Sequence, residues 1–573
     1  MAVHKKDVVK LLETIAVYME LKGENPFKIS AFRKAANALE QDDRSLNSID
    51  DFTKLAGIGK GTAAVIEEFI QTGESDALTQ LKKEVPEGLV PLLKLPGLGG
   101  KKIAKLYKEL GVDGAGSLKK ACLDHKVQAL AGFGTKTEEK IMAALEDMGK
   151  RPERLPLAFM LPIAADIESY LAECPDIIRF SRAGSMRRMA ETIKDLDFII
   201  SSSHPDKVRD YLLQIPNKGE VIAGGDTKVS LELAYDFTVS ADFRIVKDEE
   251  FATTLHHFTG SKDHNVKLRQ LAKEQRKKIS EYGVEDLESG KIETFADETA
   301  FFAHFGLPFI PPELREDGKE VEEPVRAEEL VSHDRIVADL HMHSTWSDGA
   351  FTIEEMANAC REKGYRYMAI TDHSQYLKVA GGLTPERLRE QRKEIDRLNA
   401  GFDDFTILAG VEMDILPDGT LDYDDELLQE MDLVIASIHS SFSQPKEKIM
   451  ERLKSALTNH HVDIIAHPTG RLIGRREGYD VDIDMLIRLA KETDTALELN
   501  ANPNRLDLSA GHVRKAQEAG VKIVINTDAH SVEMLEHMPI GVSTAIKGNV
   551  KGENVLNTWE LNELKQFLNR HHS

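Results

Sequence analysis

The chain has 573 residues, which is too long for a single hydrophobic core and predicts three or four domains. Its composition is that of an ordinary globular protein, and no apolar stretch reaches the length of a membrane span, so we expect no membrane association. The net charge of −23 alone argues against a nucleic-acid binder. Residues 1–150, however, hold 23 Lys and Arg against 22 Asp and Glu, so this part of the chain is nearly neutral.

The compartment is predicted from the first residues and from the cysteines. The opening MAVHKKDVVKLLETIAVYMELK has the pattern of an amphipathic helix with charges throughout, which is not the pattern of a secretory signal. Cys122, Cys174 and Cys360 lie far apart and form neither a zinc motif nor an even-numbered disulfide framework. We therefore predict reduced thiols and a cytoplasmic protein.

Residues 1–150 are expected to be helical, because apolar residues recur there at three- and four-residue spacing. Three segments share one shape, a G-x-G turn followed by a helix: LAGIGKGTAAVIEEFI, LPGLGGKKIAKLYKEL and LAGFGTKTEEKIMAAL. Such a turn leaves backbone N–H groups unpaired at a helix start, where they suit a phosphate. The residues expected to contact DNA are Gly57, Gly59, Lys60, Gly97, Gly99, Lys101, Gly132, Gly134 and Lys136.

A single loop of this kind also fits an ordinary helical hairpin. Three copies with lysine in or after the turn favour motifs that grip the DNA backbone without reading bases. A dinucleotide-binding loop is the weaker interpretation, since no apolar strand precedes any of the three.

Three aspartates mark the next region, residues 155–250, where strand-like runs appear. Asp195 and Asp197 are two residues apart in a predicted strand, which places both carboxylates on one face, and Asp242 lies in another strand, SADFRIV. Three carboxylates on adjacent strands can hold two Mg²⁺ ions, which would clamp the attacking and leaving oxygens of a phosphoryl transfer.

A glycine-serine turn stands shortly before these aspartates. Gly184 and Ser185 are expected to carry a triphosphate, and Arg188 to neutralise it. An isolated D-x-D is common in surface loops. The succession of glycine-serine, an arginine pair and D-x-D inside apolar runs is much more specific to a nucleotidyl-transfer site.

Residues 251–315 return to a helical pattern, and residues 316–333 are charged with no apolar period, so they are predicted to be a linker. From residue 334 onward, apolar runs alternate with polar or helical stretches. The seven runs are 336–343, 367–373, 406–413, 433–439, 462–467, 496–500 and 521–528. This alternation predicts parallel strands with covering helices, in a barrel-like fold whose active face lies at the strand C-termini.

Imidazole and carboxylate groups end most of these runs, as in ADLHMH, AITDHS and INTDAH. A lone histidine at a strand end is more often an ordinary core or surface residue, but nine such groups in register favour a site for divalent metal. The nine predicted ligands are His341, His343, Asp348, His373, Glu412, His439, His467, Asp528 and His530. Asp339 and Asp372 are expected to support the histidines. The region is therefore predicted to be a hydrolase.

The glycine-serine turn, the D-L-D strand and ADFRIV together resemble the nucleotidyltransferase palm of the family X DNA polymerases. HHFTGSKDHNVKLR resembles the nucleotide-pocket segment of that family, and KISEYGV a thumb segment. The resemblance covers about residues 1–315. It implies that His257, Phe258 and Gly260 flank the sugar, while Asn265 and Arg269 face the nucleobase and the template.

Two positions depart from the family pattern. Val65 stands where the sugar-phosphate lyase of the family has its Schiff-base lysine, so that activity is not expected from this residue. His257 replaces the tyrosine of the usual Tyr-Phe pair of the sugar pocket, which puts the discrimination against ribonucleotides in question.

The nine-ligand set resembles the PHP (polymerase and histidinol phosphatase) domain, a distorted seven-stranded barrel of (β/α)₇ type whose metal pattern is fully filled here. The fold class expected for the chain is thus multidomain, with helical helix-hairpin-helix domains, an α+β palm with a thumb, and a C-terminal PHP barrel. The predicted domains are helical DNA-binding 1–90, helical fingers-like 91–151, palm 152–250, thumb-like 251–315, linker 316–333 and PHP 334–573.

Together, the resemblances imply a polymerase that fills short gaps in base excision repair, fused to a 3′–5′ exonuclease or phosphoesterase. The expected cofactors are two Mg²⁺ ions in the palm and up to three Mn²⁺ or Zn²⁺ ions in the PHP domain, bridged through Glu412. The expected partners are gapped or primer-template DNA and deoxynucleoside triphosphates, bound by a monomer.

Two alternatives remain open. The PHP domain could be a small-molecule phosphatase or pyrophosphatase. A nuclease would need basic residues at the mouth of its site, for which Arg471, Arg475 and Arg476 are candidates. A DNA-binding scaffold without activity is the third interpretation, against which the complete aspartate and histidine sets argue.

Overall fold

The computed structural model describes residues 5–41, 46, 49, 51–95, 98–148 and 153–570. The chain divides into two compact units: Met1–Arg151 with Gln375–Gly382, and Pro152–Ser374 with Leu383–Ser573. Within the described ranges, none of the helices combines the length and the apolar character that crossing a membrane requires.

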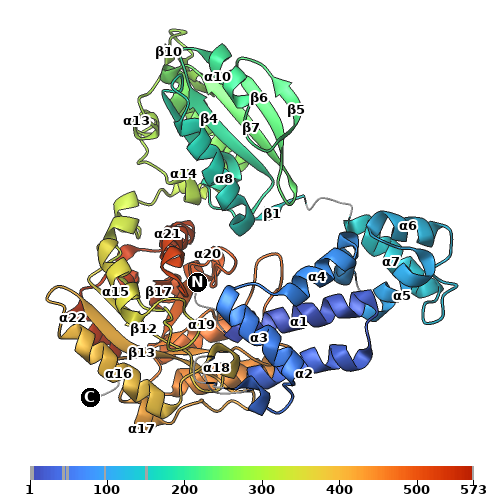
Figure 1. Cartoon of the computed structure of the whole chain (residues 1–573). Coiled ribbons are helices and arrows are strands. Elements are labelled where there is room, and N and C mark those ends of the chain that lie inside the picture. The colour runs from blue at the N-terminus through green and yellow to red at the C-terminus, as the bar shows by residue number, and fades with distance from the viewer. Residues whose placement is uncertain are drawn as a thin grey trace. The chain divides into compact units, whose positions relative to one another are not determined.

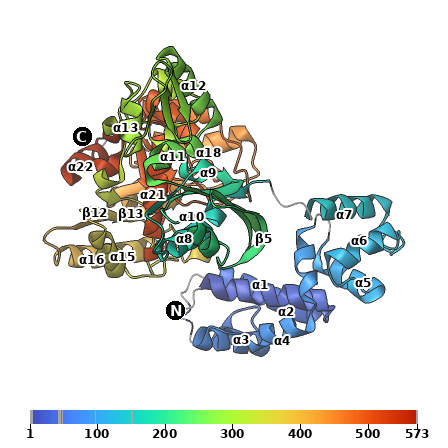
Figure 2. The same cartoon turned by 90° about the horizontal axis from the view of Figure 1, so that it is seen from above.

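The first unit is helical, as the three- and four-residue spacing predicts. Its first group of helices packs around Leu12, Ile15, Leu39 and Ile66, all completely buried. Figures 1 and 2 both show these helices as one group and the later three as another. The first group is α1 (Lys5–Lys22), α2 (Pro26–Gln41), α3 (Lys60–Thr72) and α4 (Asp76–Glu84); the second is α5 (Gly100–Leu110), α6 (Ala115–Leu123) and α7 (Thr135–Met148).

The palm region is built on a five-stranded sheet in the order β2-β4-β7-β6-β5, in which β4 and β7 run parallel and the other pairs antiparallel. Phe198, Phe243 and their neighbours form a buried cluster with helices α8 and α10 on one face of the sheet. The elements are β1 (Leu155–Pro156), α8 (Leu157–Ala172), β2 (Arg179–Arg182), α9 (Gly184–Arg187), β3 (Thr192–Ile193), β4 (Asp195–Ser201), α10 (Pro205–Leu212), β5 (Lys218–Gly224), β6 (Lys228–Ala234) and β7 (Thr238–Val246).

The thumb region follows, with a core around the buried rings of Phe301 and Phe302. A three-stranded antiparallel sheet, β10-β9-β8, lies beside its helices. The elements are α11 (Phe251–Thr259), α12 (Lys262–Glu274), β8 (Lys277–Ser280), β9 (Gly283–Asp286), β10 (Ile292–Glu293), α13 (Glu298–Ala303) and the 3-10 turn η6 (Pro312–Leu314).

Residues 316–333 are not the free linker that their charge suggests. The segment contains helix α14 (Lys319–Glu322), and its Val321 and Leu330 are buried in the thumb core. These two apolar residues are nine positions apart, so no periodic pattern reveals that the segment packs.

The C-terminal region is a parallel sheet of seven strands in chain order, β11 to β17, one in each of the seven predicted runs. A parallel bridge between Met342 and Ala529 joins the two ends of the sheet, so the barrel is nearly closed. The strands are β11 (Ala338–Asp339), β12 (Tyr367–Ile370), β13 (Thr406–Asp414), β14 (Leu433–Ser437), β15 (Ile464–Ile465), β16 (Ala496–Asn500) and β17 (Ile523–Asn526). The helices are α15 (Ile353–Glu362), α16 (Pro385–Asn399), α17 (Asp425–Leu428), α18 (Lys446–Thr458), α19 (Ile483–Glu492), α20 (Ala510–Glu518), α21 (Met538–Lys547) and α22 (Leu561–Leu568).

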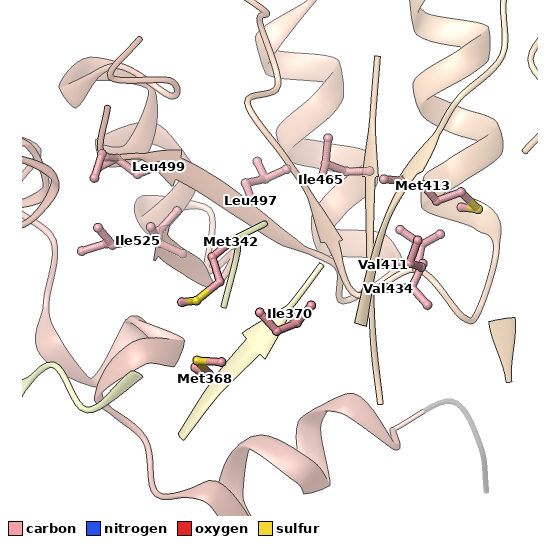
Figure 3. Packing of buried hydrophobic residues seen from close by; sticks show 14 of the residues in the cluster. Met342, Met368, Ile370, Val411, Met413, Val434, Ile465, Leu497, Leu499 and Ile525 are labelled. Atoms are coloured by element: carbon pink, nitrogen blue, oxygen red, sulfur yellow. The ribbon is translucent and has the colours of Figure 1, made fainter. Parts of the chain in front are cut away.

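The two faces of this sheet bury different side chains. One face packs against the covering helices through residues such as Val411, Met413, Leu497 and Leu499, which Figure 3 shows. The other face carries a smaller apolar cluster together with α22. Because alternate residues share a face, β13 presents Leu408, then Gly410, then Glu412 on that second face. Its apolar cluster therefore gives way to polar groups toward the strand C-termini, which is where the metal ligands were predicted.

Candidate metal centres and nucleotide pocket

The structure brings the three palm aspartates together. Asp197 of β4 lies opposite Asp242 of β7 in the register of the parallel pair, and Asp195 is on the same face two residues earlier. Lys228 Nζ lies 3.0 Å from Asp242 Oδ2. Burial raises the pKa of Asp197 to about 7, and repulsion from Asp242 and Asp195 adds to the effect. Crowded carboxylates of this kind suit Mg²⁺, which takes oxygen ligands and would relieve their repulsion.

Gly184 lies in direct contact with this acidic cluster. It has a φ of +59° at the start of α9, which also contains Ser185. A Cβ at position 184 would overlap Oδ2 of Asp197, so a side chain is excluded here by space as well as by conformation.

A pocket of about 350 Å³ collects Arg188 and the five residues that the resemblance assigns to nucleotide binding. It is lined by Arg188, His257, Phe258, Thr259, Gly260, Ser261, Lys262, Asn265 and Arg269. Arg188 Nη1 donates to the carbonyl oxygen of Thr259 at 2.5 Å, and Asn265 Nδ2 to that of His257 at 2.8 Å. The guanidinium of Arg244 lies 4.5 Å from the centre of the Phe258 ring. The backbone on this side of the pocket is thereby fixed by its own side chains.

The histidines and carboxylates of the barrel converge on three groups. In each group the possible ligand atoms lie within 4.8 Å of one another. The groups are His343 with Asp348, His373 and His530; His341 with His343 and Asp528; and His373 with Glu412 and His439. His467 joins them, with its Nε2 2.9 Å from Glu412 Oε1. All nine predicted ligands thus lie around one centre.

The spacing of these atoms fits metal ligation. Two ligands on a tetrahedral ion at Zn–N distances are about 3.3 Å apart. His343 Nε2 lies 3.2 Å from Asp528 Oδ1, and His373 Nε2 lies 3.5 Å from Asp348 Oδ1. His373 Nδ1 and Glu412 Oε2 are buried 2.9 Å apart, yet neither has a hydrogen-bond partner. A cation bound between these two buried atoms would satisfy both of them.

The protonation of these groups is set by burial and by their neighbours. Burial lowers the pKa of His343 to about 3, with repulsion from His530 and His373, so its imidazole is in the neutral form that ligates metal. Burial opposes the charge on His439 as well, but Glu412 and Asp414 outweigh it and raise the pKa of His439 to about 10.

A second layer of carboxylates holds the ligands, and the sequence predicted only part of it. Asp339 accepts from the hydroxyl of Thr527 and Asp372 from that of Ser344, so these bonds go to neighbours of the predicted ligands and not to the histidines themselves. Glu498 was missed: its Oε1 lies 2.7 Å from His341 Nδ1, and its Oε2 accepts from the backbone of His467 at 2.7 Å.

Asp414 was missed in the same way, although it ends the strand that carries Glu412. Its Oδ1 lies 3.2 Å from His439 Nδ1. Both acids stand two residues from another polar group on the ligand-bearing face of a strand, at Asn500 for Glu498 and Glu412 for Asp414. This two-residue spacing is the feature of the sequence from which Glu498 and Asp414 could have been predicted.

The three arginines predicted at the mouth of the metal site differ in the groups that they contact. Arg471 is held in an ion pair with Glu191 of the palm region, at 2.7 Å. Arg476 lies over the ring of Phe442 at 4.4 Å, and Arg475 is exposed. A further arginine that the sequence did not single out, Arg505, has its Nε 3.8 Å from Asp528 Oδ2.

The glycine loops of the first unit share one local design. In each, the middle residue of G-x-G is buried (Ile58, Leu98 or Phe133), and the described flanking glycines are exposed. Helices α3, α5 and α7 begin directly after these loops, and Lys60, Lys101 and Lys136 are exposed in their first turns. Gly97 lies outside the described residues. Val65 is in α3 and is partly buried in the first helical core, so no amine stands at that position.

Comparison with known proteins identifies four parts of the chain. Family models match for a helix-hairpin-helix domain at residues 3–75, a SAM-like helix-hairpin-helix tandem at 89–147, the DNA polymerase beta thumb at 254–316 and the PHP domain at 339–502.

The curated relatives fall into two groups. The DNA polymerase/3′-5′ exonuclease PolX of Bacillus subtilis (strain 168) is 66% identical over 567 residues, which is 99% of this chain and 100% of that protein. Probable phosphatases match less than half of the chain. One from Thermoanaerobacter sp. (strain X514) is 29% identical over 41% of this chain and 95% of its own length. One from Caldanaerobacter subterraneus is 30% identical over 41% of this chain and 91% of its own length. From the full-length match, the chain belongs to the bacterial family X DNA polymerases that carry a C-terminal PHP domain.

Proposed function

We propose that this protein adds deoxynucleotides to primer ends in gapped DNA and removes nucleotides from 3′ ends at a separate site. The observation that carries the proposal is the presence of two unlike ligand sets, carboxylates alone in the palm and mixed imidazole and carboxylate in the barrel. The first set suits Mg²⁺ and the second Mn²⁺ or Zn²⁺. The full-length relative is named for both activities.

In the palm, Asp195, Asp197 and Asp242 would hold two Mg²⁺ ions, which supply the charge that stabilises phosphoryl transfer. Gly184 leaves room for this cluster, and Ser185 and Arg188 would bind the triphosphate. His257, Phe258 and Gly260 would flank the sugar. Asn265 and Arg269 would face the nucleobase and the template. The pocket that most of these residues line supports the assignment.

In the barrel, the nine residues from His341 to His530 would hold up to three Mn²⁺ or Zn²⁺ ions, which would activate water against a phosphodiester. Glu498 and Asp414 would fix the rings of His341 and His439 in their ligating orientations. Asp339 and Asp372 would hold the backbone of the strand ends, since they accept from the backbone N–H groups of Thr527 and Ser344.

The helical unit would bind DNA through its exposed glycine loops and Lys60, Lys101 and Lys136, by backbone contacts that read no sequence. We expect no lyase activity from position 65. The proposal includes a monomer that works in the cytoplasm on base excision repair gaps. Three buried free thiols fit a reducing compartment.

The test is a pair of double variants assayed on one-nucleotide-gapped DNA, with Mg²⁺ and Mn²⁺ supplied separately. Asp195→Ala with Asp197→Ala should abolish primer extension and keep primer degradation. His341→Ala with His343→Ala should do the reverse. If either pair left both activities unchanged, or removed both, the assignment of two independent sites would be wrong.

A small-molecule phosphatase is the second candidate for the barrel, and the probable-phosphatase relatives favour it. One comparison distinguishes the two functions. It sets the rate of hydrolysis of a phosphomonoester, such as p-nitrophenyl phosphate, against the rate of hydrolysis of a single-stranded 3′ end. A nuclease should lose activity on DNA as salt rises, because its substrate is held by phosphate contacts. A phosphatase should change little.

A further inference from the structure

Glu316 lies between the nucleotide pocket and the last turn of a barrel helix. Its carboxylate is ion-paired with Lys547, the final residue of α21, and its Oε1 is 3.7 Å from Arg188 Nε. Lys547 Nζ also lies 3.4 Å from the carbonyl oxygen of Arg188. One carboxylate is thus shared between a cation from the barrel and the arginine proposed to bind triphosphate.

The backbone around Glu316 is anchored on both sides. Ser261, which lines the pocket, donates its hydroxyl to the carbonyl of Glu316 and its N–H to that of Arg315 at 3.1 Å. On the barrel side, Ser543 of α21 donates to Glu313 at 3.1 Å. The backbone at Glu316 is therefore held beside the pocket, and its exposed side chain lies between Lys547 and Arg188.

The guanidinium of Arg188 has a donor that makes no hydrogen bond. Its Nη1 is bonded to Thr259, but its Nε is buried and has no hydrogen-bond partner. The Glu316 carboxylate lies 3.7 Å from this Nε, beyond hydrogen-bonding distance, and is paired with Lys547. A buried donor of this kind will take an acceptor when one comes within reach, whether a phosphate oxygen or a carboxylate.

We propose that Lys547 of the barrel is a positioning residue for Arg188. By holding the Glu316 carboxylate, it keeps the guanidinium available to a nucleoside triphosphate. This inference rests on the proposed polymerase function. Without Lys547, Glu316 would pair with Arg188 and compete with the triphosphate, so nucleotide binding would weaken while the chemical step, which depends on the palm aspartates, would not.

The experiment measures KM and kcat for the templated deoxynucleoside triphosphate, on one-nucleotide-gapped DNA with Mg²⁺, in the full-length protein. Lys547→Met should raise KM roughly threefold to tenfold and leave kcat within about twofold. Glu316→Gln should not raise KM, and adding it to Lys547→Met should restore the wild-type KM. Lys547→Arg, which keeps the charge, should behave as wild type.

Lys551→Met is the matched control, since Lys551 stands four residues after Lys547 but pairs with Glu329, at 3.4 Å, and not with Glu316. It should change neither constant. Primer degradation by each preparation reports whether the barrel is folded. The inference is overturned if Lys547→Met leaves KM unchanged, if its defect persists beside Glu316→Gln, or if Lys547→Arg is equally impaired. Extension by the wild-type protein tests the polymerase function separately.

Discussion

Gly184 and Asp197 are so close that a methyl group on residue 184 would overlap the Asp197 carboxylate. This contact explains why the residue before Ser185 has no side chain. It also places the turn that would bind the triphosphate directly against the strand that would bind metal.

Gly184→Ala is therefore expected to reduce primer extension by about a hundredfold or more, because Asp197 would have to move. Gly290→Ala is the matched control: its φ is +70°, close to that of Gly184, but a Cβ there meets nothing within 4 Å. Both variants carry a similar backbone cost of about 1 kcal/mol. Primer-extension kinetics should separate them, and equal defects would show that backbone strain, not the contact with Asp197, is responsible.

The titration of Asp197 predicts a pH-dependent stability in the presence of EDTA. Its folded-state pKa of about 7 lies above the ordinary value for aspartate. The stabilisation by the protonated form is thus complete below pH about 4 and is lost as pH rises through 7. Asp197→Asn should raise the free energy of unfolding on the order of 2 kcal/mol at pH 8.

The expected difference between Asp197→Asn and wild type should shrink toward zero by pH 4. Thermal unfolding at a series of pH values measures it. Asp236→Asn, at an exposed turn position in the same region, makes the same change of charge and should show no such pH dependence.

The contacts of Glu498 predict that its substitution weakens metal binding, and metal affinity can be measured without an assay of activity. Glu498→Gln would weaken the support of His341 and of the His467 backbone, so the affinity for Mn²⁺ should fall about 10–100-fold. Metal content after dialysis against a chelator of known strength gives the affinity. Primer degradation should recover at high Mn²⁺, and primer extension should be unaffected. Glu354→Gln, an exposed substitution of the same kind in α15, should retain metal. Normal metal retention by Glu498→Gln would contradict the assigned role.

A buried network of charged side chains predicts a substitution that should strongly destabilise the thumb region. Arg315 is completely buried and pairs at 2.6 Å with Glu298, which also pairs with Arg187 at 2.6 Å. Arg315→Met should cost about 3 kcal/mol, seen as roughly a hundredfold faster hydrogen exchange of the α13 amides. Lys319→Met, which removes an exposed pair with Asp317, should leave that exchange unchanged. Slow exchange in both variants would mean that the network adds no stability.

Much of this architecture can be predicted from the sequence, for a physical reason. The seven strands of the barrel are buried on both faces, so each appears as an apolar run. Imidazole and carboxylate groups at the ends of most of these runs together indicate a shared polar site. Asp195 and Asp197 were placed on one face by spacing alone, and that face is the one shared with Asp242.

What the sequence could not supply are the contacts between distant segments. Glu498 reads as one polar residue within an apolar strand, and only folding brings it to His341, 157 residues earlier. Arg471 reads as a basic residue near a metal site, but its partner Glu191 belongs to the palm region. The packing of Val321 and Leu330 went unpredicted because two isolated apolar residues form no pattern.

The closing bridge between Met342 and Ala529 has a consequence for the protein as it leaves the ribosome. The first ligands, His341 and His343, and the last, Asp528 and His530, meet only across that seam. A nascent chain therefore contains all three palm aspartates once residue 242 has been made. The ligand groups of the barrel can come together only after His530 has been added, 288 residues later.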